Sequence, residues 1–163
     1  MEENSTNFVN PNLIVLNAEA ATAEDCIRIS SKLFIENGYV KKGYDQMVID
    51  REKEFPTGLP GKEINIAIPH TNNTLVNNPA IGVVIPKEPV VFTMMGSNDT
   101  LLECSVILPL VIKDPGTQIS ILKKIIKLIQ DTKLLKSIKE SESAEGVADL
   151  LNNFFSQEEK GGS

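Results

Sequence analysis

One stretch of nine residues constrains the fold more than any other part of this chain. Residues 104–112 read CSVILPLVI, a nearly continuous apolar run. Such a run is typical of a central strand in a sheet that is covered on both faces. Pro109 has no amide hydrogen to donate, so we expect a bulge or an early end to strand pairing at this position.

Four further segments have the character of strands. Ile64, Ile66 and Ile68 recur with the period of two that a strand requires, and this strand runs directly into Pro69-His70. The other predicted strands are residues 12–16, 81–85 and 90–94. We therefore expect a sheet of about five strands.

Helical spacing of apolar residues flanks this block of strands on both sides. Thr22 and Asp25 form a predicted capping box for a helix that closes at Gly38. The other predicted helices are residues 44–54, 119–129, 131–138 and 143–155. Together these elements predict one α/β (α+β) domain over residues 8–155, a mixed sheet with helices on both faces, and a disordered tail at 156–163.

Composition and charge exclude several classes of protein. The net charge is −6, so the basic surface of a nucleic-acid-binding protein is missing. No run approaches the roughly 20 apolar residues that span a bilayer. The first residues lack the basic start and apolar centre of a signal peptide, so we expect a cytoplasmic protein that is not embedded in a membrane. Cys26 and Cys104 form no metal-binding spacing and are predicted to be free, buried thiols.

His70 is the only histidine, and it stands where a predicted strand delivers the chain to a loop. Sites in α/β folds commonly lie at such strand ends. A neutral imidazole nitrogen is a nucleophile at neutral pH, and it can later leave again, so the residue suits a phosphoryl carrier. The alternative is a structural histidine in a small binding or scaffold domain. One histidine without clustered partners provides too few ligands for a metal.

Two further side chains are candidates for contacts with a phosphoryl group. Arg51 continues the apolar stripe of the helix at 44–54, so it should point along the buried face, where a guanidinium could stabilise transferring phosphate. The alternative is an arginine in a surface salt bridge, for which Glu52 and Glu54 are available. Gln118 lies at the start of a helix, where anions are favoured, or is simply a polar first-turn residue.

Motifs for other chemistries are missing. The chain contains no GxxxxGK[ST] or GxGxxG segment for a nucleotide, and no GxSxG segment with a second histidine for a hydrolase. We therefore expect no cofactor and no metal. A phosphate carrier without a nucleotide site has to receive phosphate from another protein or a small phosphodonor.

The segment INIAIPHT at residues 64–71 resembles the active-site segment of enzyme IIA domains of the bacterial phosphoenolpyruvate:sugar phosphotransferase system, in the mannitol/fructose class. Residues 49–58, IDREKEFPTG, resemble the arginine-bearing helix and Pro-Thr-Gly turn of the same family. The combination is most similar to galactitol-type IIA proteins, and the likeness extends over residues 8 to 155.

This resemblance implies a phosphotransferase component. His70 would be phosphorylated on Nε2 by phospho-HPr and would pass the phosphoryl group to a cysteine of the cognate enzyme IIB, while the membrane component IIC carries galactitol or a related sugar. Arg51 falls on the arginine of the family's active site. We expect a shallow, exposed histidine within an apolar surface that has a polar rim, to which Leu59, Val76 and residues 71–77 are candidates to contribute.

The sequence departs from the family pattern at two positions. Thr71 follows the histidine, where the family often has Gly, Ala or Cys. Gln118 stands where mannitol-type members have a second active-site histidine; glutamine cannot exchange protons but can donate a hydrogen bond. Glu63 matches the family's acidic residue only with an offset of one and is not carried over. A regulatory IIA-like phosphoprotein, which binds other proteins without sugar transport, would share all these features.

Overall fold

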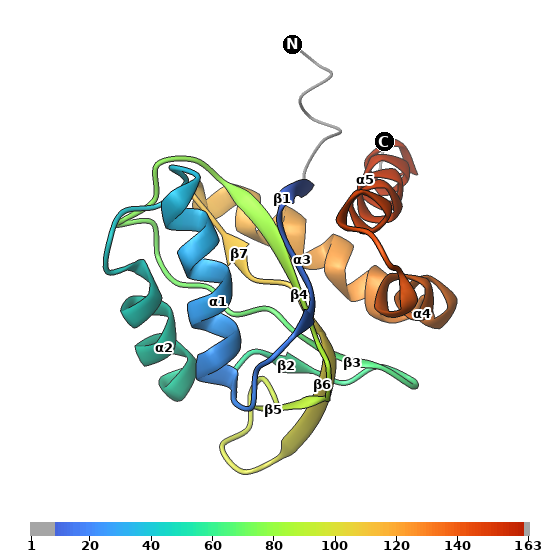
Figure 1. Ribbon diagram of the computed structural model, residues 1–163, viewed down its shortest axis with the longest axis horizontal. Helices are drawn as coiled ribbons and strands as arrows, with labels where there is room; N and C mark the ends of the chain where they lie inside the picture. Colours follow the sequence, from blue (N-terminus) through green and yellow to red (C-terminus); the bar gives the residue numbers. More distant parts are fainter. Residues whose placement is uncertain (1–8, 162–163) are drawn as a thin grey trace.

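The computed structural model describes residues 9–161, with side chains up to Gln157. Its strands are β1 (Val9–Ala18), β2 (Gly58–Leu59), β3 (Asn65–Ala67), β4 (Ala80–Pro86), β5 (Val90–Thr93), β6 (Leu101–Ile107) and β7 (Leu110–Val111). Its helices are α1 (Ala23–Glu36), α2 (Tyr44–Glu54), α3 (Pro115–Ile129), α4 (Thr132–Glu140) and α5 (Ala144–Gly161). The predicted single α/β domain with a mixed sheet is confirmed (Figure 1).

The sheet has the strand order β1-β4-β6-β3-β2, with β5 paired to β6 and β7 paired to β4. The pairs β1-β4 and β3-β6 are parallel, and the others are antiparallel. Within residues 9–161 the sheet has seven strands rather than the expected five or so. The apolar run 104–112 breaks before Pro109, as predicted, into β6 and β7. The short β2, within the Pro- and Gly-rich segment, pairs with β3 and was not predicted.

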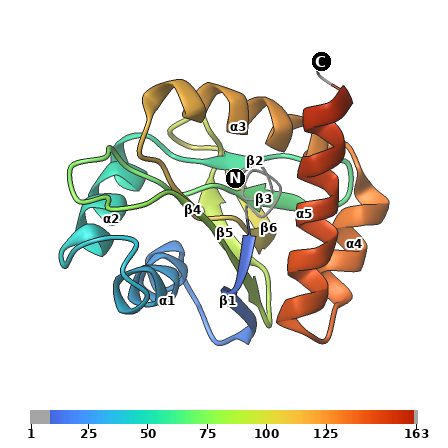
Figure 2. The same cartoon turned by 90° about the horizontal axis from the view of Figure 1, so that it is seen from above.

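Helices cover both faces of the sheet. Figure 2 shows α1 and α2 on one side, with α3, α4 and α5 on the other. Neighbouring residues on one strand pack into opposite layers: Val106 belongs to the cluster that includes α3 and α5, and Ile107 to the cluster that includes α1. Both side chains are fully buried, which explains why this end of β6 is apolar on both faces.

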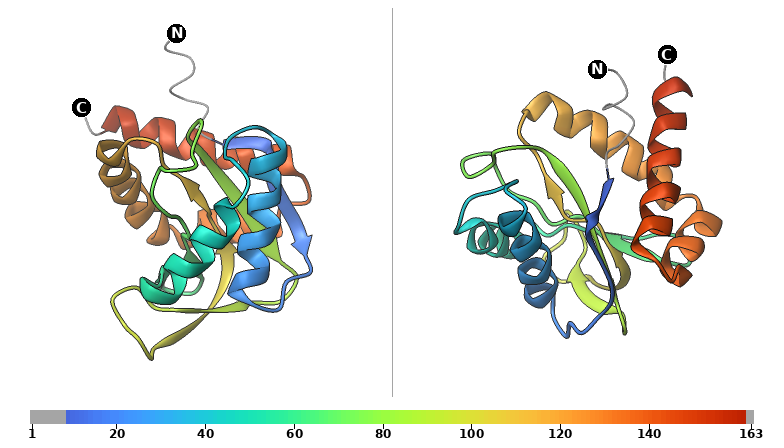
Figure 3. Two further views of the ribbon diagram at one scale, coloured as in Figure 1. Left: turned by 90° about the vertical axis from the view of Figure 1, so that its left-hand side faces the viewer. Right: turned by 45° about the horizontal axis from the view of Figure 1, so that its top comes forward.

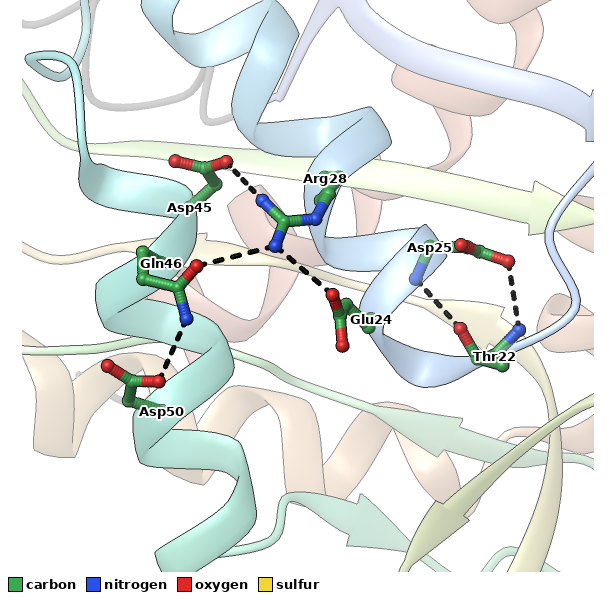
Figure 4. A network of polar contacts seen from close by, with 7 residues as sticks. All are labelled: Thr22, Glu24, Asp25, Arg28, Asp45, Gln46 and Asp50. Carbon is green, nitrogen blue, oxygen red and sulfur yellow. Dashed lines mark hydrogen bonds and ion pairs between the residues drawn. The ribbon is translucent and has the colours of Figure 1, made fainter.

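Helices α1 and α2 are joined by polar contacts centred on Arg28 (Figure 4). Its guanidinium donates to Asp45 of α2 at 2.7 Å and to Glu24 of its own helix at 3.1 Å. The predicted capping box of Thr22 and Asp25 is present at the start of α1. Each exposed ion pair contributes little, about 0.2–1 kcal/mol, but the contacts tie the first turn of α2 to α1. This matters because α2 carries Arg51.

The C-terminal helix is longer than the sequence indicated. α5 continues to Gly161, so most of the segment predicted as a disordered tail is helical; the last two residues lie outside the described part of the chain. Gln, Glu and Lys, which follow Phe155, are good helix formers and can extend a helix that packing has already started. Asn152 of α5 accepts from the amide of Val9 at 2.8 Å and donates to its carbonyl at 2.9 Å, at the start of β1. Figure 3 shows α5, in red, alongside β1, in blue.

Both cysteines are free and buried, as predicted. Burial raises the pKa of the Cys26 and Cys104 thiols to about 12, so both stay protonated. Within residues 9–161, no helix has the length and apolar character that crossing a membrane requires.

Candidate functional site

His70 lies just beyond β3, in a segment that residues 108–110 hold in place through backbone hydrogen bonds. Leu108 donates its amide to Ala67 at 2.8 Å, and Leu110 donates to Pro69 at 3.0 Å. The break at Pro109 lies between these two bonds. The strand-like path therefore continues past Ala67 to the histidine, and this gives His70 a well-defined backbone.

The hydrogen bond of the His70 ring defines its tautomer. Nδ1 lies 2.7 Å from the carbonyl oxygen of Ile68, which can only accept, so Nδ1 carries the hydrogen and Nε2 carries the lone pair. In the described part of the chain, Arg51 Nε is the one fully buried side-chain nitrogen or oxygen without a hydrogen bond. Nε2 of His70 also lacks a hydrogen bond there, so it is not fully buried and reaches solvent.

The histidine is less exposed than we expected. Only 5% of its surface is accessible, which corrects the prediction of a shallow, exposed ring. Burial lowers the pKa of His70; the Ile68 carbonyl raises it and the charge on Arg51 lowers it further. The net direction is downward, so the ring is neutral at pH 7 and its Nε2 lone pair is available.

Arg51 lies on the last turn of α2, close enough to His70 for its charge to affect the histidine pKa. Its side chain is half-buried, as the helical spacing predicted. The guanidinium makes no ion pair or hydrogen bond within residues 9–161, and its one ring contact is with Phe55, 5.0 Å from Cζ to the ring centroid. Arg51 therefore does not form the surface salt bridge that was the alternative expectation. The donors of this arginine are therefore available to a bound anion.

Glu52, the neighbour of Arg51, faces Thr57 instead. Its two carboxylate oxygens accept from the amide and from the hydroxyl of Thr57, at 2.9 and 2.8 Å. Burial raises the pKa of Glu52 to about 7, although the Thr57 bonds and the charge on Arg51 act in the opposite direction. In the sequence, Glu52 is recognisable only as a possible salt-bridge partner of Arg51. The signal for its contact with Thr57 is a glutamate five residues before the threonine of a Pro-Thr-Gly segment.

The raised pKa of Glu52 predicts a pH-dependent stability. Between the ordinary value of 4.5 and about 7, the native state holds a proton that the unfolded chain has released. Unfolding then releases a proton, so this contribution lowers the free energy of unfolding as the pH rises through that range. Glu52→Gln removes the titration, so the variant should gain stability over the wild type between pH 5 and pH 8.

Urea denaturation of both proteins at the two pH values measures this difference. The exposed Glu54→Gln variant serves as the control, because it removes a carboxylate from the same helix without a buried partner. If the free energies of unfolding of Glu52→Gln and the wild type differ by the same amount at both pH values, the raised pKa of Glu52 is contradicted.

Gln118 makes no hydrogen bond to either of the other two candidates within the described residues. It is half-buried in the first turn of α3, and its side chain makes no hydrogen bond within residues 9–161. The connection is indirect: Asn73, in the loop after His70, donates to the carbonyl of Lys113 at 2.8 Å, next to the helix start. Thr71 is buried, with 7% of its surface accessible.

One residue of the predicted apolar surface is not exposed. Val76 is buried in the core, whereas Leu59 is half-buried. Phe55, which contacts Arg51, is 53% exposed, and Met95, whose amide bonds Gly58, is 40% exposed. Apolar side chains that could meet a partner are therefore present next to the arginine and the Pro-Thr-Gly turn.

Comparison with known proteins identifies a family. Residues 7–154 match the model for the family described as "Phosphoenolpyruvate-dependent sugar phosphotransferase system, EIIA 2". The galactitol-specific EIIA component of Escherichia coli strain K12 is 27% identical over 104 residues, which are 64% of this chain and 69% of the relative.

Solved structures share the fold. The complex of enzyme IIA and phosphorylated enzyme IIB of the E. coli mannitol system contains a chain with a TM-score of 0.72 at 23% identity, covering 89% of this chain and 97% of that one. The nitrogen regulatory protein IIA-Ntr from Neisseria meningitidis gives a TM-score of 0.70 at 22% identity, covering 91% of this chain and 99% of that one. At these identities the likeness shows the fold alone.

Proposed function

Because the chain belongs to the EIIA 2 family of the phosphoenolpyruvate-dependent sugar phosphotransferase system, we propose that it is a phosphohistidine carrier. His70 accepts a phosphoryl group from phospho-HPr on Nε2 and passes it to a cysteine of the cognate enzyme IIB. Arg51 stabilises the phosphoryl oxygens during both transfers. The protein acts in the cytoplasm and serves the membrane component IIC through IIB.

One observation carries this proposal: a neutral imidazole with an unbonded Nε2 lies near an arginine without an ion-pair partner in the described residues. Either feature alone is compatible with a structural role. Together they provide a nucleophile and a stabiliser of negative charge, which are the two things that phosphoryl transfer requires of a protein without a nucleotide site.

The transfer follows from the ring geometry. The Nε2 lone pair forms a bond to phosphorus while the donor's own bond to phosphorus breaks and its electron pair stays with the donor. The ring then carries phosphate on Nε2 and hydrogen on Nδ1, so it gains positive charge, which the Ile68 carbonyl at 2.7 Å stabilises. In the second transfer the thiolate of IIB attacks phosphorus, and the electron pair returns to Nε2.

Similarity supports a proposal for the substrate of the pathway. The galactitol-specific relative suggests galactitol or a related sugar as the compound that the complete system takes up. The relative in complex with phosphorylated IIB supports a IIB protein as acceptor. The alternative is a regulatory role without sugar transport, which the likeness to the nitrogen regulatory protein brings into consideration.

Intact-mass measurement tests the carrier function. The protein is incubated with phosphoenolpyruvate, enzyme I and HPr, and we expect one added phosphoryl group that acid removes. Galactitol-type IIB, added afterwards, should discharge the labelled protein. No labelling with active partners would refute the proposal, whereas labelling without discharge by any sugar-specific IIB would favour the regulatory alternative.

A further inference from the structure

We propose that Glu52 is a positioning residue that fixes His70 relative to Arg51 by clamping the Pro-Thr-Gly turn to the end of α2. The inference rests on the proposed function, since it concerns the same two side chains. It assigns a role to a half-buried carboxylate that makes no hydrogen bond to the histidine.

The clamp is a two-point contact. Thr57 donates its amide to one Glu52 oxygen at 2.9 Å and its hydroxyl to the other at 2.8 Å. Only 2% of the Thr57 surface is accessible, so water does not readily replace these bonds. Hydrogen bonds to a charged or partly charged acceptor in such surroundings are short and directional, and both oxygens are directed at one residue.

Two more hydrogen bonds connect the clamp to the histidine. The carbonyl of Thr57 accepts from the amide of Ile68 at 3.2 Å, and the carbonyl of Ile68 accepts from Nδ1 of His70 at 2.7 Å. The Ile68 residue is thus held on one side by the turn and holds the imidazole on the other. A movement of Thr57 would move the acceptor that defines the His70 tautomer.

The same carboxylate positions the arginine. Glu52 follows Arg51 directly on α2, and the Phe55 amide closes this helix end by donating to the Arg51 carbonyl at 2.6 Å. The guanidinium has no hydrogen bond of its own in the described residues, so its position depends on where the helix ends. Without Glu52, nothing polar on α2 would tie that end to the turn.

The other side of the turn is already closed. Gly58 accepts from the Met95 amide at 2.8 Å, and a Cβ at this position would lie 2.7 Å from the backbone oxygen of Thr93. The turn is therefore packed against β5 and its following residues. Glu52 holds this segment from the side of α2, so that it is held on both sides. This arrangement is consistent with a role in positioning the segment rather than in packing the core.

Three variants of the full-length protein test the clamp. Glu52→Ala removes both contacts. Glu52→Gln keeps both, because the amide oxygen can accept from the Thr57 amide while the amide nitrogen donates to the hydroxyl. Glu54→Ala, on the exposed side of the same helix, is the matched control. ¹⁵N NMR of the imidazole reports the tautomer of His70 without any phosphodonor, and transfer from phospho-HPr is timed separately.

We expect Glu52→Ala to lose the pure Nδ1–H form of His70 and to slow phosphoryl transfer about 10- to 100-fold, since small misplacements have effects of this size. Glu52→Gln should keep the tautomer and stay within about threefold of the wild-type rate. A folded Glu52→Ala protein with the wild-type tautomer and rate would overturn the proposal. So would a glutamine variant as slow as the alanine variant, because the contribution would then be charge and not position.

Thr57→Val covers the case in which Glu52→Ala does not fold. It removes the hydroxyl contact and keeps the amide contact, so we expect a smaller effect in the same direction, and an unchanged tautomer and rate would overturn the clamp. The NMR result separates this inference from the carrier function. If the wild type is never phosphorylated but the tautomer depends on Glu52, the carrier function fails and the clamp stands.

Discussion

Replacing His70 by glutamine should abolish phosphorylation completely while leaving the protein folded. The substitution removes the Nε2 lone pair, which is the nucleophile, and no other histidine exists in the chain to replace it. The wild-type ring is neutral at pH 7, so glutamine preserves the charge. The lost hydrogen bond to Ile68 should lower the free energy of unfolding by about 1 kcal/mol.

Intact mass after incubation with phosphoenolpyruvate, enzyme I and HPr measures the effect, and urea denaturation measures the stability. The Glu54→Gln variant, which changes an exposed side chain near Arg51, should label like the wild type. If His70→Gln still acquires an acid-labile phosphoryl group, another residue accepts the phosphate. If it unfolds instead, its loss of labelling carries no weight, and a His70→Asn variant replaces it.

The sequence predicted the fold where a single periodic signal dominated. The apolar run 104–112 indicated a central strand covered on both faces, and Pro109 marked its break, because both properties are local. It did not predict β2, since two residues pair with β3 only through the tertiary arrangement. α5 ran past the predicted end, because helix propensity alone does not mark where packing stops.

The site was predictable in part for the same reason. His70 stood out as the only histidine at the end of a strand, and the spacing of Arg51 indicated the buried face. The low exposure of the ring, its hydrogen bond to Ile68 and the contact between Glu52 and Thr57 depend on how separate segments meet. A sequence motif shows only which residues are close together along the chain, so these contacts and their physical role are apparent only in the structure.

Replacing Arg51 by alanine should slow phosphoryl transfer by about 10²- to 10³-fold, the usual effect of removing one donor that stabilises developing negative charge. The folded state should lose little stability, because the guanidinium has no hydrogen bond or ion pair in the described residues and leaves one buried nitrogen unsatisfied. Arg51→Lys keeps the positive charge but loses the planar guanidinium with its paired donors. Its transfer rate should therefore lie between those of the wild type and Arg51→Ala.

Two measurements separate this role from a general effect of charge. Lys53→Ala removes a positive charge from an exposed position on the same helix and should leave the transfer rate unchanged. The charge on Arg51 lowers the pKa of His70, so Arg51→Ala should raise that pKa, which NMR titration detects without any partner protein. A higher histidine pKa with an unchanged transfer rate would mean that Arg51 lies near the ring but does not act on the phosphoryl group. An unchanged pKa together with a slow rate would mean that Arg51 acts on the bound phosphoryl group alone, with the histidine beyond the reach of its charge.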